Sequence, residues 1–382
     1  MTVLGSALAI VALLYCIAVV FLFTGLFRLR RKPSDVVRMV SVVIAVHNEE
    51  KNLEACLDCC INQDYPSDKY EVVVADDRSI DATPSIVERY RKKYANVKYA
   101  RVEPGEVAIP KKTALVKALK IAVGEIILST DGDCKQGRGW ITSMNRCFTD
   151  RVGMVVGHVG YFRPGNVWAG IDALDYCSHR ALGAGYIGVG SVYTCTAANM
   201  AYRKDIYTAN VDGFAQLKVR PAEDNYLLHC TRNAGYTIAV ATDPDSIVET
   251  TGANSFSHFM QQRFRWSAYG GSITTIGVKL FFVPALLFYV LLWICMVAAI
   301  FSPSLLPFLL LSFTGKVVAD FLLMAKYTSL YRIGHLLRYF IPLSIVHPVF
   351  APLVAISGNL FSFTWKKRRY TAECEVVEGC QS

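Results

Sequence analysis

The sequence "GEIILSTDGDC", residues 124–134, joins an apolar run to two carboxylates that flank a single glycine. Glu125 to Thr130 has the pattern of a buried strand, and Asp131 and Asp133 follow it directly. Asp-Gly is common turn chemistry, so a plain turn is the simplest interpretation of the loop taken alone. The other interpretation is a metal site, and the sequence on either side decides between the two.

Strand and helix patterns alternate from about residue 38 to residue 130. Strands are expected at Val40–Val46, Glu71–Ala75, Val97–Val102 and Glu125–Thr130, and helices at Glu49–Ile61, Ala82–Tyr94 and Lys111–Val123. This βαβαβαβ order predicts an α/β domain in which a mostly parallel sheet carries helices on both faces. In such sheets ligands bind outside the carboxyl ends of the strands.

Polar clusters follow three of these strands and should therefore meet at one edge of the sheet. Carboxylates gathered there repel one another unless a cation or a donor-rich ligand lies among them. Mg²⁺, and Mn²⁺ in the same way, is bound by one or two carboxylates together with phosphate oxygens. The clusters are His47-Asn48-Glu49, Asp76-Asp77 and Asp131-Gly132-Asp133.

Two further features fit a nucleotide diphosphate at that edge. Asp77 can accept hydrogen bonds from a base or ribose, and Lys111, at the start of a predicted helix, can reach phosphate. The chain has no GxxxxGK[ST] motif, which excludes a P-loop NTPase. Gly183 to Gly188 matches GxGxxG by letter but follows no suitable strand, so we expect a flexible loop bordering the site there.

The chain is too apolar for an ordinary soluble protein, because 53% of its 382 residues are hydrophobic and its mean hydropathy is +0.32. Val3 to Phe27 carries no charge and is long enough to span a bilayer. Basic residues follow this run instead of preceding it, which predicts a membrane anchor with the next segment in the cytoplasm. The net charge of +9 lies near the apolar segments and indicates anionic lipid headgroups, not nucleic acid.

A second apolar block begins near residue 280. Leu280–Phe301 is one expected span, and a second ends near Met324. Tyr339–Trp365 is interrupted by prolines, and the basic residues on both sides of it favour a re-entrant or interfacial segment over a true span. Lys316 and Asp320 lie four residues apart within the middle span, which predicts an ion pair and leaves a substrate path as the alternative.

Two stretches stand out in the second half of the soluble part. In "RPAEDNYLLH", Glu223 and Asp224 precede an apolar helix, and a plain helix cap would explain them. In "SHFMQQRFRWSAYGG", Gln262, Arg265 and Trp266 are spaced to share one helix face, as an interfacial amphipathic helix would also require.

The ordered set of motifs resembles the membrane-bound inverting glycosyltransferases of family 2, which have the GT-A fold. The family is similar to cellulose, chitin and hyaluronan synthases, ceramide glucosyltransferase, and bacterial glycolipid or carotenoid glycosyltransferases. Ala45 departs from the proline that many members have in the first strand. The matching stretches are "VSVVIAVHNEE", "YEVVVADDRSIDAT", "KKTAL", "TDGDC", "TAANMAYRK", "AED", "QQRFRW" and "TWKKRRY".

The resemblance implies a Rossmann-like GT-A domain at 38–270, with an N-terminal transmembrane anchor at 1–32, two to three C-terminal membrane segments at 280–365, and a basic then acidic tail at 366–382. It implies that Asp77 and Lys111 bind the nucleotide, next to the cluster of His47, Asn48 and Glu49. Asp131 and Asp133 would hold Mg²⁺ or Mn²⁺ and the diphosphate. Asp224 would be the catalytic base, and Gln262, Arg265 and Trp266 would line the acceptor mouth and stabilise the leaving diphosphate.

The function implied is transfer of a sugar from a nucleotide-diphosphate sugar, first of all a UDP-sugar, to a hydroxyl of a membrane-associated lipid or glycan. A processive polysaccharide synthase is the first alternative, although four or fewer apolar segments are few for a channel. A non-catalytic nucleotide-sugar-binding scaffold is the second, but it should have lost one of the motif residues, and none is missing. The expected location is a multi-pass protein of the cell inner membrane with its catalytic domain in the cytoplasm. The sequence leaves the sugar, the base, the acceptor and the oligomeric state open.

Overall fold

The computed structural model describes residues 2–29, 32–103, 105–106, 111–161, 165–216, 223–253, 255–270, 276–357, 363–365 and 368–370. Two compact units make up the chain. Residues 30–163 and 194–251 form the sheet unit, and residues 1–29, 164–193 and 252–382 form the helical unit. This division follows packing contacts, so the expected domain boundaries at 32, 38, 270, 280 and 365 stay a prediction.

The sheet unit begins with the alternation that the sequence predicts. Its helices and strands are β1 Val40–Val46, α2 Leu53–Ile61, β2 Tyr70–Asp77, α3 Thr83–Lys93, β3 Val97–Val102, α4 Lys112–Ile121, β4 Ile126–Asp131, β5 Lys135–Gln136, α5 Trp140–Asn145, β6 Val152–Val156, β7 Val159–Tyr161, β8 Met200–Arg203, α7 Lys204–Ala209, α8 Val211–Gln216, α9 Glu223–Asn233, β9 Thr237–Val240 and β10 Val248–Thr250.

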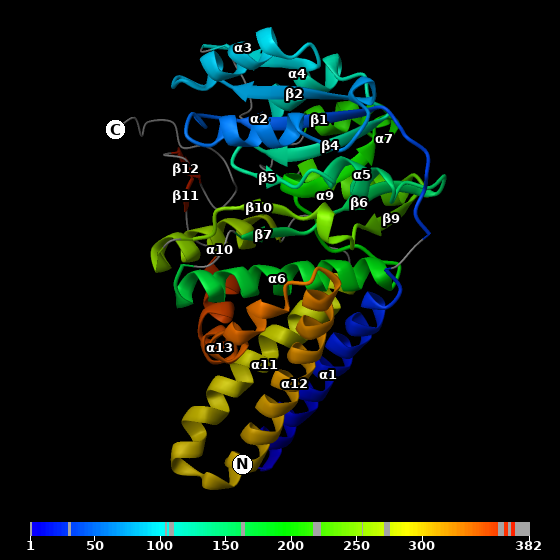
Figure 1. Cartoon of the computed structure of the whole chain (residues 1–382). Coiled ribbons are helices and arrows are strands. Elements are labelled where there is room, and N and C mark those ends of the chain that lie inside the picture. Colours follow the sequence, from blue (N-terminus) through cyan, green and yellow to red (C-terminus); the bar gives the residue numbers. More distant parts are fainter. Residues whose placement is uncertain are drawn as a thin grey trace. The chain divides into compact units, whose positions relative to one another are not determined.

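The main sheet of the described residues has the strand order β3-β2-β1-β4-β8-β6-β9 (Figure 1). β3, β2, β1 and β4 run parallel to one another, and β6 runs parallel to β9. Only β8 runs antiparallel to its neighbours, β4 and β6. β1 pairs with a strand on each side, which explains why nearly every residue of its apolar run is buried. The mostly parallel α/β sheet is thus confirmed. β5, β10 and β7 form a small second sheet.

One helix of this unit starts later than the sequence predicts. α2 begins at Leu53, not at Glu49. Asn48 has a positive φ of 52°, and the backbone N–H of Glu49 donates to Thr83 Oγ1 at 2.8 Å. These contacts hold residues 48–52 as a turn against the loop after β2, so the helix cannot begin before them.

The helical unit contains α1 Thr2–Leu26, α6 Val167–Gly188, α10 Phe256–Gly270, α11 Ile276–Phe301, α12 Leu306–Leu330, α13 Phe340–Ser357 and the short pair β11 Phe363–Trp365 and β12 Arg368–Tyr370. Within the described residues, four helical segments are long and apolar enough to cross a bilayer, at Val3–Leu26, Gly277–Ala299, Pro303–Leu330 and Gly334–Val354. One N-terminal and three C-terminal candidate spans agree with the expected count.

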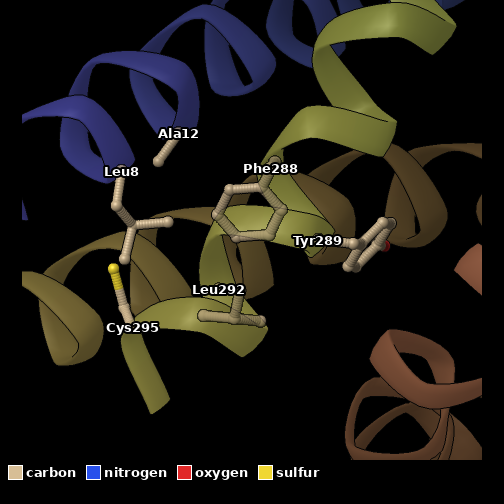
Figure 2. Packing of buried hydrophobic residues seen from close by; sticks show 6 residues of the cluster. All are labelled: Leu8, Ala12, Phe288, Tyr289, Leu292 and Cys295. Carbon is tan, nitrogen blue, oxygen red and sulfur yellow. The ribbon is translucent and has the colours of Figure 1, made fainter. Parts of the chain in front are cut away.

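Apolar packing joins the first helix to the C-terminal block. α1 runs beside α11 and α12 in Figure 1. Figure 2 shows Leu8 and Ala12 of α1 facing Phe288 and Leu292 of α11, and all four side chains are at most 5% exposed. Segments from opposite ends of the sequence therefore build one helix bundle.

One expectation for this unit is wrong. Gly183 to Gly188 is not a loop but the last part of α6. A Cβ at Gly185 or Gly188 would collide with the backbone of α1 at Leu22 and Gly25, so these glycines permit close packing of two helices. The last apolar segment, expected over Tyr339–Trp365, includes α13 and the strand Phe363–Trp365, which pairs with Arg368–Tyr370. That it re-enters the membrane instead of crossing it stays a prediction.

Candidate active site

The carboxyl ends of β1, β2 and β4 lie in register at one edge of the main sheet. Val46 pairs with Asp76, and Ala45 pairs with Asp131. The three predicted polar clusters follow these strand ends, so their meeting at one edge is confirmed for the backbone. The side-chain contacts show how closely the clusters are connected.

The loop after β1 is tied to the loop after β2. His47 Nδ1 lies 2.6 Å from the carbonyl oxygen of Asp77. The backbone N–H of Asn48 donates to Ser79 Oγ at 2.9 Å, and Asn48 Oδ1 accepts from the N–H of Ile80 at 2.9 Å. An asparagine suits this position, because its short polar side chain tolerates a positive φ and bonds to nearby backbone.

The same loop also packs on the loop after β4. A Cβ at Gly132 would lie 2.7 Å from Val46 Cγ1 and 3.3 Å from Glu49 Cγ. The limited space at this position therefore favours glycine between Asp131 and Asp133. Glu49 is itself 8% exposed.

The two aspartates at the end of β2 have different surroundings. Asp76 is fully buried and accepts from the N–H of Ser79 at 3.0 Å and from Tyr99 OH at 2.6 Å, so it stabilises the loop. Asp77 is 3% exposed, and its Oδ1 accepts from Arg78 Nε at 2.9 Å. Its Oδ2 accepts from the backbone N–H of Lys111 at 2.9 Å, which connects β2 to the start of α4.

Lys111 lies at the centre of the charged side chains. Its Nζ is 2.9 Å from Glu223 Oε1 and 3.4 Å from Asp131 Oδ1. Burial by itself would lower the pKa of this amine, but the carboxylates of Asp131 and Glu223 outweigh burial and raise the pKa above its ordinary value. The amine is thus a fixed positive charge. Its residue has a φ of 60°, a left-handed conformation unusual for lysine.

Asp131 ends β4, and Asp133 follows in the loop, where its Oδ1 accepts from the thiol of Cys134 at 3.7 Å. Both carboxylates are partly exposed. No group of three or more His, Cys, Asp and Glu side chains in the described part of the chain could hold a metal by itself. Two partly exposed carboxylates do fit a Mg²⁺ or Mn²⁺ site in which a diphosphate and water supply the remaining ligands.

Asp224 lies in the first turn of α9 and contacts the segment before β8. Its Oδ2 accepts from the N–H of Ala197 at 3.3 Å, and its Oδ1 accepts from the N–H of Asn225 at 2.7 Å. Asn225 Oδ1 in turn accepts from the N–H of Cys195 at 3.3 Å. The structure therefore brings "AED" and "TAANM" together, and through Glu223 it brings both to Lys111.

The predicted acceptor motif "QQRFRW", residues 261–266, lies in the helical unit. Gln262 and Trp266 are on α10, as the expected helix requires, whereas the side chain of Arg265 is outside the described part. The ring centroid of Trp266 is 5.3 Å from that of Tyr176 on α6, and Gln262 Oε1 accepts from Arg263 Nη1 at 2.6 Å.

Two charged residues lie among the predicted site residues, although the sequence assigned neither of them a part in binding or catalysis. Glu223 is 8% exposed beside Lys111, and Arg263 is 2% exposed between Gln262 and Trp266. A signal for a buried cation existed in the sequence, because Asp172 and Asp175 lie three residues apart among the apolar residues Ile171, Ala173 and Leu174. Buried carboxylates with that spacing require a common cation.

Comparison with known proteins agrees with this geometry. The family model for Glycosyl transferase family 21 matches residues 2–373. Glycosyltransferase AglE of Haloferax volcanii is 24% identical over 227 residues, which are 59% of this chain and 71% of that protein. The poly(ribitol-phosphate) beta-glucosyltransferase of Bacillus spizizenii is 40% identical over 96 residues, 25% of this chain but only 14% of that longer protein.

Among solved structures, the Pyrobaculum calidifontis mannosyltransferase PcManGT, in complex with GDP-Man and Mn²⁺, superposes with a TM-score of 0.54. It is 20% identical, and the match covers 91% of this chain and 99% of that one. At this identity the likeness shows a shared fold, and that fold is the one the motifs imply.

Proposed function

Because the chain belongs to Glycosyl transferase family 21, we propose that it moves a sugar from a nucleotide-diphosphate sugar to a hydroxyl of a membrane-associated lipid or glycan, with inversion at the anomeric carbon. A UDP-sugar is the first donor to test. The family makes the chain a glycosyltransferase, and the donor, acceptor and stereochemistry are the proposal.

One observation carries the proposal above the others. Lys111 Nζ lies between the carboxylates of Asp131 and Glu223. Glu223 directly precedes Asp224 in the chain. A lysine held between carboxylates of a metal loop and of a base motif is suited to a ligand that brings both phosphate charge and a reacting sugar.

The donor side is built by the sheet unit. Asp77 and the loop of His47, Asn48 and Glu49 would bind the nucleoside, since they border the same strand ends. Lys111 would bind the diphosphate. Asp131 and Asp133 would hold the divalent metal, which neutralises charge on the diphosphate when bound. Mn²⁺ in the complex of the Pyrobaculum enzyme supports the choice of metal to test.

The reaction is a single displacement. Asp224 takes the proton of the acceptor hydroxyl, and the oxygen forms a bond to the anomeric carbon from the side opposite the leaving group. The bond from that carbon to the phosphate oxygen breaks, and the nucleoside diphosphate leaves with the electron pair. Lys111 balances the charge that develops on it.

Three residues of α10 would serve the acceptor and the leaving group. Gln262 and Trp266 offer an amide and an aromatic face to the acceptor, and Arg265 adds positive charge for the departing diphosphate. This assignment rests on the motif and on the position of the two described side chains on one helix.

We place the protein as a multi-pass protein of the inner membrane, with the sheet unit and the tail in the cytoplasm. Basic residues on both sides of the last apolar segment support this orientation. Labelling intact cells with a membrane-impermeant thiol reagent tests it. Cys374 and Cys380, which lie outside the described residues, should stay unlabelled, and labelling of either would make the last segment a true span.

The proposed reaction is tested by incubating the purified full-length protein in nanodiscs with a panel of nucleotide sugars. We expect one donor to release nucleoside diphosphate in the presence of Mn²⁺ and a lipid extract, and EDTA to stop the release. Mass spectrometry of the lipid product should show one added sugar. A ladder of longer products would support a processive synthase, and no release from any donor would refute the proposal.

A further inference from the structure

Arg263 lies inside the sequence "QQRFRW" but belongs to none of the predicted site positions. Its side chain is 2% exposed although it carries a charge. Its Nη1 is 2.5 Å from Asp172 Oδ1, and its Nη2 and Nε are 2.6 and 2.9 Å from Asp175 Oδ2. Both aspartates are on α6 and are at most 1% exposed. The guanidinium therefore anchors α10 to α6.

The same guanidinium also contacts two of the predicted acceptor residues. Its Nη1 donates to Gln262 Oε1 at 2.6 Å. Its central carbon lies 4.7 Å from the ring centroid of Trp266 and 4.0 Å from that of Phe259. A hydrogen bond and a cation–π contact from one planar, buried group restrict the rotamers of both neighbours.

Trp266 also contacts rings of the helix that carries the two aspartates. Tyr176 and His179 of α6 have ring centroids 5.3 and 6.0 Å from that of Trp266. Asp172, Asp175, Tyr176 and His179 are spaced at i, i+3, i+4 and i+7, so they form one face of α6. This face holds Arg263 by charge and Trp266 by ring contact.

The two carboxylates contribute unequally. Burial raises the pKa of Asp172, and Arg263 offsets this only in part. Burial also acts to raise the pKa of Asp175, but the guanidinium of Arg263, with His179 and His347 nearby, outweighs it and leaves that pKa below its ordinary value. Of the two carboxylates, Asp175 is thus the one whose ionised form Arg263 favours more, and it also accepts from two guanidinium nitrogens, Nε and Nη2.

We propose that Arg263 is a positioning residue for transfer: anchored by Asp172 and Asp175, it holds Gln262 and Trp266 in the orientation in which they meet the acceptor. This inference rests on the proposed acceptor role of those two side chains. If Arg263 only linked α6 to α10, the ion pairs with Asp172 and Asp175 would be sufficient. The direct contacts of Arg263 with Gln262 and Trp266 distinguish a positioning role from a purely structural link between the helices.

Arg263→Lys is the main test, because it keeps the charge and the ion pair but removes the planar fork that reaches several partners at once. Asp175→Asn is the second variant, since it keeps the shape of the anchor. Glu71→Gln is the matched control. It weakens another ion pair of a buried carboxylate, Lys98 Nζ to Glu71 Oε2 at 2.6 Å, and no contact of that pair with Gln262 or Trp266 is found in the described residues.

All variants are prepared as full-length protein in nanodiscs. Transfer is measured with the active donor and with ceramide or diacylglycerol as the acceptor. We expect kcat/KM for the acceptor to fall by about 10- to 100-fold in Arg263→Lys, the usual effect of a misplaced binding group, while affinity for Mn²⁺–UDP stays within about twofold. Glu71→Gln should lower the thermal midpoint without this loss.

A fluorescence measurement tests the positioning without any turnover. The emission of Trp266, taken as each protein minus its Trp266→Phe counterpart, should shift to longer wavelength and be quenched more strongly by acrylamide in Arg263→Lys and Asp175→Asn. If the parent releases no nucleoside diphosphate from any donor in the presence of the lipid extract, the proposed function fails on its own, and the Trp266 emission alone decides the inference. Unchanged Trp266 emission, or unchanged acceptor kcat/KM in a folded variant, overturns it.

Discussion

Replacing Asp224 by asparagine separates a catalytic base from a helix cap, because the two roles predict effects of different size. Asp224 Oδ2 and Oδ1 accept from the N–H groups of Ala197 and Asn225. Asparagine keeps one acceptor oxygen and nearly the same shape, but it cannot take a proton. The structural cost is one weak hydrogen bond of 3.3 Å and a negative charge at the first turn of α9.

These losses amount to about 1–2 kcal/mol of folding free energy, as one hydrogen bond and one charge near a helix N-terminus contribute. A general base contributes about 10²- to 10⁴-fold in rate, which is about 3–5 kcal/mol of activation free energy. We therefore expect Asp224→Asn to fold, to bind Mn²⁺–UDP like the parent, and to transfer sugar about 10²- to 10⁴-fold more slowly.

The assay combines single-turnover transfer with calorimetry of Mn²⁺–UDP binding and a thermal melt in nanodiscs. Glu223→Gln is the comparison, since it changes the neighbouring carboxylate and weakens the contact with Lys111 but leaves Asp224 in place. Near-normal transfer by a folded Asp224→Asn would remove this residue from the mechanism. Glu223 would then be the next carboxylate to examine.

Three other substitutions test separate parts of the molecule. Asp133→Ala should abolish transfer and metal-dependent nucleotide binding, while Asp77→Ala should weaken nucleotide binding even without metal; calorimetry with and without Mn²⁺ distinguishes them, and unchanged binding in Asp133→Ala would make its loop a plain turn. Burial lowers the pKa of His179. The positive charges of Arg263 and Arg180 lower it further, and together these effects outweigh Asp175, which would raise it. The folded state thus favours the neutral ring, so the stability that depends on it is present above the ordinary histidine pKa of about 6.5 and is lost as the pH falls below that value. Between pH 7 and pH 5 the thermal midpoint of the parent should fall more than that of His179→Gln, because only the parent has this histidine to protonate. Parallel curves of midpoint against pH would show that His179 does not contribute to the loss of stability in acid.

The sequence by itself determined the elements whose signals are local. The alternating patterns from Val40 to Thr130 predicted the parallel strands closely, because side-chain periodicity and the short αβ connections depend on neighbouring residues. The convergence of His47, Asp77 and Asp131 followed from a general property of parallel sheets. The four apolar helices followed from length and composition.

Tertiary structure decided the contacts between residues far apart in the chain. Periodicity could not show that Lys111 meets Glu223, that Asp224 holds the N–H of Ala197, or that Arg263 is bound by Asp172 and Asp175. It also misled at Gly183–Gly188, where a loop pattern is in fact a helix packed on α1. Partner choice for a buried charge, and the space allowed to a glycine, depend on which distant segment lies opposite, and only the packed chain supplies that segment.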